Sequence, residues 1–264
     1  LAERLQWGAM RMDPTDIADV TGAAYTYLVN GHGPADNWTG LFRPGERVRL
    51  RLINAAAMTV FNFRIPGLKL TVVQADGQNV RPVTTDELQI TVAETYDIVV
   101  EPAEDRSYTI VAEASDRSGL GRATLAPRAG MSAEVPPLRE RPILTMTDMG
   151  MGEMDHGATS DDPHAGQVAP GPAAAASSHG SHAMRDFSNA PNVARTPAVQ
   201  SIAPMPIDRT GEPGIGLDAV GHDVLTYRDL MALDRNPDVR APSRSLQIHL
   251  TGNMERYMWA FDGV

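Results

Sequence analysis

The chain has 264 residues, a formal net charge of −10 and no cysteine. The negative charge argues against nucleic acid as the main partner, because phosphate binding requires an excess of Lys and Arg. The missing cysteines exclude disulfides, cysteine-ligated zinc and thiol nucleophiles, and no apolar run approaches the roughly 20 residues of a membrane span.

The first elements are weakly marked. We expect residues 1–19 to form a lead-in with one short helix. Asp13 is a good N-cap and Pro14 suits the first helical position, and Gly22 should end this helix after about two turns. Tyr25–Val29 then favours a strand.

Period-two alternation begins after Pro44-Gly45. Val48, Leu50 and Leu52 fall on one face of the segment and arginines on the other, which is typical of a half-buried strand. Further strands are predicted at Phe61–Ile65, Leu68–Ala75, Leu88–Val92, Tyr96–Val100, Tyr108–Ala114 and Arg122–Ala126. Turn residues such as Pro66-Gly67, Asp76-Gly77 and Arg81-Pro82 separate the runs. Short strands at this spacing predict an all-β antiparallel sandwich or barrel.

Arg47, Arg49 and Arg51 form a basic row on one strand face. The row is either an anion- or partner-binding patch or a set of cross-strand ion pairs. We favour pairing, which contributes little per pair at an exposed surface, with acidic neighbours such as Asp86, Glu87, Glu94 or Asp97.

Composition changes near Gly150. Residues 155–206 are rich in Ala, Pro, Gly, Ser and His and have almost no periodicity. Such a segment cannot bury enough apolar surface to offset an ordering cost of roughly 1–2 kcal/mol per residue. We therefore expect residues 143–221 to be a largely disordered Met/His-rich linker.

Regular structure is expected again in residues 222–264. Thr226–Leu233 predicts a short helix that Thr226 begins. Leu246, Ile248 and Leu250 alternate as in a strand, and Tyr257–Phe261 follows as another.

Methionines cluster at the start of the linker. Thioethers are soft donors that bind Cu(I) in preference to hard cations, and closely spaced methionines can surround one ion. Two structural alternatives stay open: an amphipathic helix, against which Gly150 and Gly152 each count roughly 1 kcal/mol, and a strand Ile143–Met146 with Met146 in the core. The metal-site hypothesis includes Met146, Met149, Met151, Met154 and His156.

A looser set follows in the same linker. His179, His182 and Met184 could chelate a metal transiently, although histidines in a solvated segment usually bind nothing. We interpret His32, His222 and His249 as structural, because none has a partner nearby in the sequence.

Several strings together resemble a known family. RPGERVRLRLINA, IPGLKLTVVQADGQNV and VAETYDIVVEP are similar to the second cupredoxin domain of bacterial multicopper oxidases of the copper-resistance type. The likeness covers most of residues 7–150 and 222–264. It implies a cupredoxin-like Greek-key β-sandwich at residues 20–142. It also implies a truncated second cupredoxin domain, the start of the family's third, at residues 222–264. We accordingly expect an internal fragment of a longer protein.

The resemblance also implies a function. Members are periplasmic enzymes that use copper to oxidise Cu(I) or phenols and reduce dioxygen to water. Their catalytic coppers sit on two His and one Cys and on His-x-His pairs, in the first and third domains. This chain has no Cys and no His-x-His, so no catalytic residue is assigned and the fragment alone should be inactive. The implied partners are copper ions and the flanking cupredoxin domains of the same polypeptide.

Two other functions stay open. The chain could be a copper-sequestering binding protein whose β-sandwich is a scaffold without oxidase activity, or an interaction module with no metal role. The deciding ligand motifs would lie in sequence outside residues 1–264. A truncated domain would also expose a strand edge, so we expect deletion of residues 222–264 to improve solubility.

Overall fold

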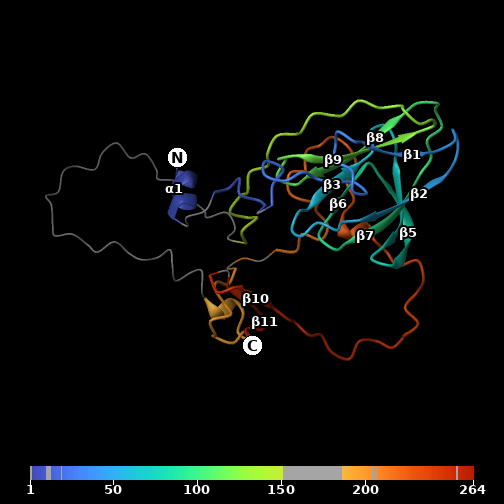
Figure 1. The fold of residues 1–264 in the computed structure, drawn as a ribbon. Helices are drawn as coiled ribbons and strands as arrows, with labels where there is room; N and C mark the ends of the chain where they lie inside the picture. The colour runs from blue at the N-terminus through green and yellow to red at the C-terminus, as the bar shows by residue number, and fades with distance from the viewer. Residues whose placement is uncertain are drawn as a thin grey trace, which may run out of the picture. The chain divides into compact units, whose positions relative to one another are not determined.

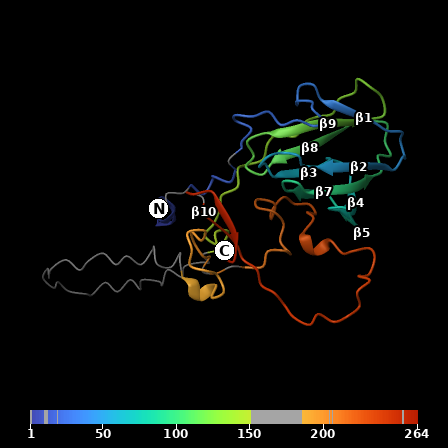
Figure 2. The same ribbon diagram turned by 60° about the horizontal axis from the view of Figure 1, so that its bottom comes forward.

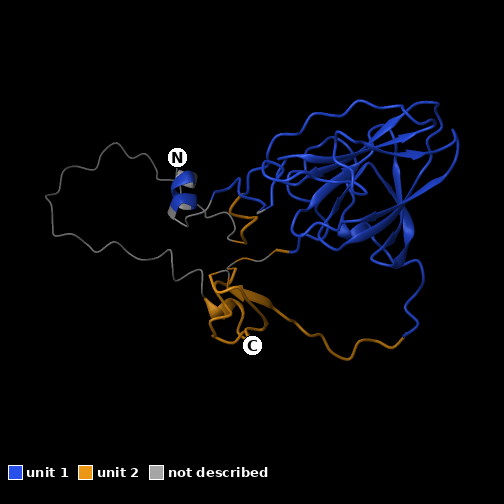
Figure 3. Cartoon of the chain, in the orientation of Figure 1, with its two compact units in different colours: residues 1–144, 208–238 blue, residues 145–207, 239–264 orange. Residues whose placement is uncertain are grey.

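The chain divides into two units in a computed structural model (Figure 3). The structure describes residues 2–9, 13–18, 20–150, 186–203, 205, 207–253 and 255–264. The sandwich unit comprises Leu1–Leu144 and Asp208–Asp238, and the second unit comprises Thr145–Ile207 and Val239–Val264.

The described elements are mostly strands. They are α1 (Ala2–Ala9), β1 (Trp38–Leu41), β2 (Val48–Ile53), β3 (Phe61–Arg64), β4 (Leu70–Ala75), β5 (Gln78–Thr85), β6 (Glu87–Ile90), β7 (Thr95–Val100), β8 (Tyr108–Ala114), β9 (Leu120–Ala126), β10 (Leu250–Asn253) and β11 (Met258–Phe261). Two 3₁₀ turns, Phe187–Asn189 and Tyr227–Asp229, complete the set.

Two sheets form the sandwich unit (Figures 1 and 2). One has the order β1-β9-β8-β3-β6 and the other β2-β7-β4-β5, and their pairs are antiparallel except for the parallel pair β1–β9. Both sheets contribute to one apolar core, in which Leu70, Val72 and Ile98 of one sheet join Leu88 and Leu125 of the other. The predicted all-β sandwich is confirmed.

Local sequence signals explain much of this architecture. In β2, Val48, Leu50 and Leu52 are half-buried and Arg49 and Arg51 are exposed, as the alternation predicts. The predicted Asp76-Gly77 turn joins β4 to β5. Both turn residues have positive φ, 45° and 78°, which suits a tight hairpin.

One of the predicted strand separators is wrong. Arg81-Pro82 lies inside β5 rather than between strands. Proline is tolerated there because β5 is the last strand of its sheet, where a missing N–H breaks no ladder between central strands.

Two predictions near the N-terminus are wrong. The described residues after Asp13 form turns rather than a helix, because the Asp13 carboxylate accepts hydrogen bonds from both Thr15 N–H and Thr15 Oγ1. Such local bonds compete with helix formation, and the helix lies at Ala2–Ala9 instead. Tyr25–Val29 forms no strand, since Val29 pairs only with His32 in an isolated bridge.

The C-terminal predictions hold in part. The expected helix at Thr226–Leu233 is a single 3₁₀ turn, and the strand expected from Leu246 begins only at Leu250. In the second unit, β10 and β11 pair antiparallel from Leu250–Phe261 to Asn253–Met258.

Residues 208–238, which we call the strap, cover the last strand of each sheet in the sandwich unit (Figure 1, orange). At β6, Leu225 N–H donates to Glu87 O at 2.9 Å, and Leu225 joins the core. At β5, Arg81 N–H donates to Met231 O at 2.8 Å and Leu233 N–H to Asn79 O at 2.9 Å. The strap therefore comprises the end of the predicted linker and the start of the predicted third domain.

Candidate metal centre

A short turn holds the first two methionines of the predicted site. The Thr145 N–H and Oγ1 both donate to Asp148 Oδ2 at 2.7 Å, and Met149 N–H donates to Met146 O at 3.2 Å. Both methionine side chains are half-buried. Residues 143–146 form no strand, so the alternative in which Met146 ends a strand is wrong.

The remaining members of the hypothesis cannot be placed. Met151, Met154, His156, His179, His182 and Met184 all lie outside the described residues. The structure therefore brings together Met146 and Met149 and leaves the rest of the predicted set as a prediction.

Harder ligands do not gather in the part of the chain that the structure describes. No group of three or more His, Cys, Asp or Glu side chains there could hold a metal ion. His222 Nε2 lies 2.7 Å from Glu87 Oε2, and His249 Nδ1 lies 3.0 Å from Asp262 Oδ1. Each of these histidines has a carboxylate partner that its sequence neighbours did not predict.

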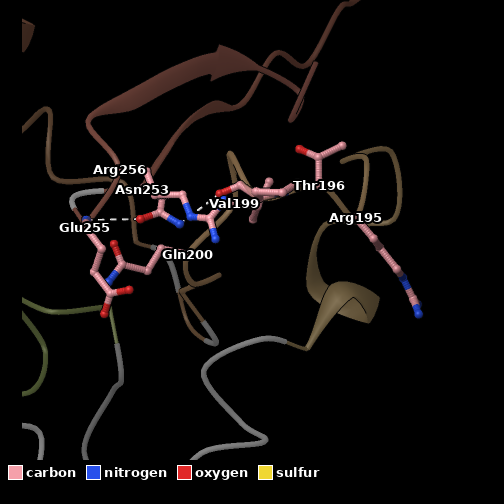
Figure 4. A pocket seen from close by; sticks show the side chains of 8 residues that line it. Arg195, Thr196, Val199, Gln200, Asn253, Glu255 and Arg256 are labelled. Atoms are coloured by element: carbon pink, nitrogen blue, oxygen red, sulfur yellow. Dashed lines mark hydrogen bonds between the residues drawn. The ribbon is translucent and has the colours of Figure 1, made fainter.

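An open pocket lies in the second unit (Figure 4). Asn253 organises one side of it, because its side chain donates to Pro197 O at 2.9 Å and accepts from Glu255 N–H at 3.0 Å. Arg195 points away and stacks over the ring of Phe187. The lining contains no histidine, cysteine or methionine, so it offers no copper donor of those kinds.

The basic row on β2 forms ion pairs, as predicted. Arg49 and Arg51 both reach Asp97 on the neighbouring β7, with Arg51 Nε at 3.6 Å, and Arg47 Nε lies 2.9 Å from Glu101. These pairs occupy the row, and the binding-patch interpretation loses its support.

Sequence reasoning missed a group of buried charges in the sandwich unit. Neither carboxylate side chain at its centre is exposed to solvent. The members come from β3, β6, β8, a turn, the strap and residues 127–144 after β9, which we call the exit segment. They are Arg64, Glu87, Glu113, Arg117, Arg139 and His222, and no regular spacing in the sequence could have identified this buried ion cluster.

Arg139 is the centre of the buried ion cluster. Its guanidinium donates to Glu87 Oε1 at 2.6 Å and to Glu113 Oε2 at 2.6 Å, and its N–H donates to Glu113 Oε1 at 2.8 Å. Burial alone would lower the pKa of Arg139, but the hydrogen bonds and charges of the two glutamates raise it. Arg117 Nη1 adds a bond of 2.8 Å to Glu113 and Nη2 one of 3.0 Å to Gly216 O in the strap.

Comparison with known proteins identifies the family. A family model for multicopper oxidases matches residues 6–129. The whole chain is 48% identical to a copper resistance protein A homolog of Pseudomonas syringae pv. tomato and 47% identical to copper resistance protein A of Escherichia coli. The chain belongs to the multicopper oxidase family. It spans about half the length of these relatives, 46% and 48%.

Among solved structures, a laccase from Botrytis aclada is similar to this multicopper oxidase chain. The similarity covers 40% of this chain and 21% of the laccase chain. The match has 27% identity and a TM-score of 0.35, too low to support any statement about the whole chain.

Family membership agrees with the predicted cupredoxin-like sandwich and implies copper as the cofactor. Of the predicted donors, the described residues supply only the thioethers of Met146 and Met149, which suit Cu(I) better than a hard cation. No helix among the described residues is long and apolar enough to cross a membrane.

Proposed function

We propose that this chain is the central part of a periplasmic copper-resistance multicopper oxidase. The supporting observation is identity of 47–48% to copper resistance protein A sequences along the entire chain. In this proposal the enzyme oxidises Cu(I) or phenolic substrates one electron at a time. Four such oxidations supply the electrons that, with four protons, convert one dioxygen molecule to two waters.

The catalytic copper ligands belong, in this proposal, to flanking cupredoxin domains of the same polypeptide. This chain has neither cysteine nor a His-x-His pair, so it cannot supply the thiolate or the paired imidazoles. The sandwich unit acts as the middle cupredoxin domain, and residues 239–264 begin the next one. Because residues 208–238 belong to the sandwich unit, this proposal begins the next domain at residue 239 rather than at residue 222.

The Met/His segment has a different role from the sandwich. We assign it to Cu(I) collection, because it carries several closely spaced thioethers together with imidazoles, and thioethers prefer Cu(I) to hard cations. The proposed donors are Met146, Met149, Met151, Met154 and His156, with His179, His182 and Met184 as a weaker second group. Cu(I) is here a substrate that the segment captures before oxidation.

The test is an anaerobic Cu(I) titration of this chain against a chromogenic chelator. Wild type should compete for Cu(I), and replacement of Met149, Met151 and Met154 by leucine should abolish most of that competition. Leucine keeps the volume and apolarity of methionine but removes the sulfur.

A matched control replaces three methionines outside the segment, Met58, Met231 and Met258, which are all exposed. This control should bind Cu(I) like wild type. Equal binding by wild type and both triple variants, or no binding by any of them, would contradict the proposed collection role.

A further inference from the structure

The second unit brings a sequence-distant methionine beside the turn that holds Met146 and Met149. Met205 N–H donates to Gly150 O at 2.8 Å. Met205 is therefore a direct backbone neighbour of the residue that follows Met149, although 56 positions separate Met149 from Met205. Met205 is 56% exposed, so the residue can be reached from solvent.

Gly150 makes this close approach possible. Its φ of +68° is a conformation that residues with a side chain rarely adopt. A Cβ atom on Gly150 would also lie only 2.9 Å from Ala203 Cβ. Glycine at this position thus allows the segment containing Ala203 and Met205 to lie against the methionine turn.

The donors around the turn are soft. The Asp148 carboxylate accepts hydrogen bonds from the Thr145 N–H and Oγ1, which reduces its availability to a cation. Within the described ranges, no other cluster of three His, Asp or Glu side chains competes for a metal. The backbone bonds place Met205 next to the turn that carries Met146 and Met149, and thioether donors favour Cu(I), or its redox-inert analogue Ag(I), over hard divalent ions.

We infer that Met205 is a third thioether ligand, with Met146 and Met149, of a Cu(I) site in the second unit. This inference rests on the proposed Cu(I)-collecting role and extends it to a residue outside the methionine run. The backbone hydrogen bond pre-positions the third donor, and pre-positioning lowers the entropy cost of closing a ring of ligands around an ion.

The test uses the full chain labelled with ¹³C at its methionine methyl groups, whose signals are assigned by single Met→Leu variants. Ag(I) is added stepwise while the methyl signals are recorded. The signals of Met146, Met149 and Met205 should shift together over the same range of added Ag(I). Those of Met58 and Met231, which are 52% exposed and lie in the sandwich unit, should not move in that range.

Two variants then test the geometry. Met205→Leu should weaken Cu(I) binding at least about tenfold, a loss typical of disturbed metal sites, whereas Met231→Leu should leave it unchanged. Gly150→Ala removes no donor but forces the two segments apart, and it should weaken binding similarly. Because Met205 is exposed, Met205→Leu should not unfold the chain, so a loss of Cu(I) binding would reflect the missing sulfur. Circular dichroism of the variant checks that it is folded.

The outcomes separate the two proposals. This inference would be overturned if the Met146 and Met149 signals shift, the Met205 signal does not, and Met205→Leu binds Cu(I) as tightly as wild type. The collecting role would then remain in place. No response from any methionine of the second unit would overturn both.

Discussion

At the residue scale, the buried charges are the least expected feature of the chain. Glu87 and Glu113 have fully buried carboxylates, which are costly to desolvate unless each is paired and hydrogen-bonded. Arg139 bonds to both, and Arg117 and His222 each add one more partner. The arrangement ties β6 and β8 to the exit segment and the strap.

We predict that Glu113→Gln destabilises the sandwich unit by roughly 3–5 kcal/mol, because the buried Arg117 guanidinium loses its charged partner. The measurement is urea unfolding followed by circular dichroism near neutral pH. Glu104→Gln is the control, because Glu104 pairs with Arg106 at the surface and such pairs contribute at most about 1 kcal/mol. Equal losses in the two variants would count against a special role for the cluster.

The stability difference between wild type and Glu113→Gln should also depend on pH. Burial alone would raise the pKa of Glu113, but the backbone N–H and charge of Arg139, with the charge of Arg117, lower it below the ordinary value of a glutamate. A carboxyl group with a lower pKa in the folded state stabilises the fold above its unfolded-state pKa. That contribution disappears as the pH falls through the folded-state value. The stability difference between wild type and Glu113→Gln should therefore shrink in acid below about pH 4.5.

At the scale of elements, the strap completes both sheets. β5 and β6 are the last strands of their sheets, and unpaired edges of this kind invite association with other chains. Residues 223–225 and 231–233 supply backbone partners to these two strands, and Leu225 adds an apolar anchor in the core. The strap thus acts as part of the sandwich.

We predict that the strap stays bound after the chain is cut. Cleavage at a protease site engineered between residues 160 and 170 would break the covalent connection between residues 1–144 and the strap. The two pieces should still elute together in size-exclusion chromatography, because backbone bonds and Leu225 hold them. Adding Leu225→Asp, which places a charge in the core, should release the C-terminal piece. Separation of the pieces without that substitution would contradict this role.

At the scale of the whole molecule, the described residues of the second unit form a much smaller apolar core than those of the sandwich unit. The second unit's apolar cluster of Ala190, Val193 and Val199 is small, and the hairpin β10–β11 leaves large side chains in solvent. Trp259 is 74% exposed and Phe261 65%. Exposed apolar groups of this size favour association.

This difference changes the expected effect of truncation. Ending the chain at residue 238 should raise the soluble fraction, because it removes the exposed hairpin. Ending it at residue 221, as the sequence suggested, should lower thermal stability, because Leu225 leaves the core and β5 and β6 lose their covers. Soluble yield and melting temperature of the two truncated chains measure this, and a more stable 1–221 chain would disprove the strap's contribution.

The sequence by itself determined features that depend on near neighbours. Alternation identified β2, the Asp76-Gly77 pair identified its hairpin turn, and the absence of cysteine from residues 1–264 excluded thiolate ligands there. These properties follow from a side-chain period of two, from backbone preferences at single residues and from ligand chemistry. None of them requires knowledge of distant contacts.

Only the tertiary structure decided which distant residues meet. Arg139 and His222 reach Glu87 from separate segments, the strap pairs with β5 and β6, and Met205 lies beside Gly150. The position of Pro82 inside β5 also depends on distant contacts. A strand tolerates proline when it lies at a sheet edge, and the sheet order is set by the tertiary structure. Such pairings depend on how the whole chain buries its apolar surface, and no local pattern in a single sequence records them.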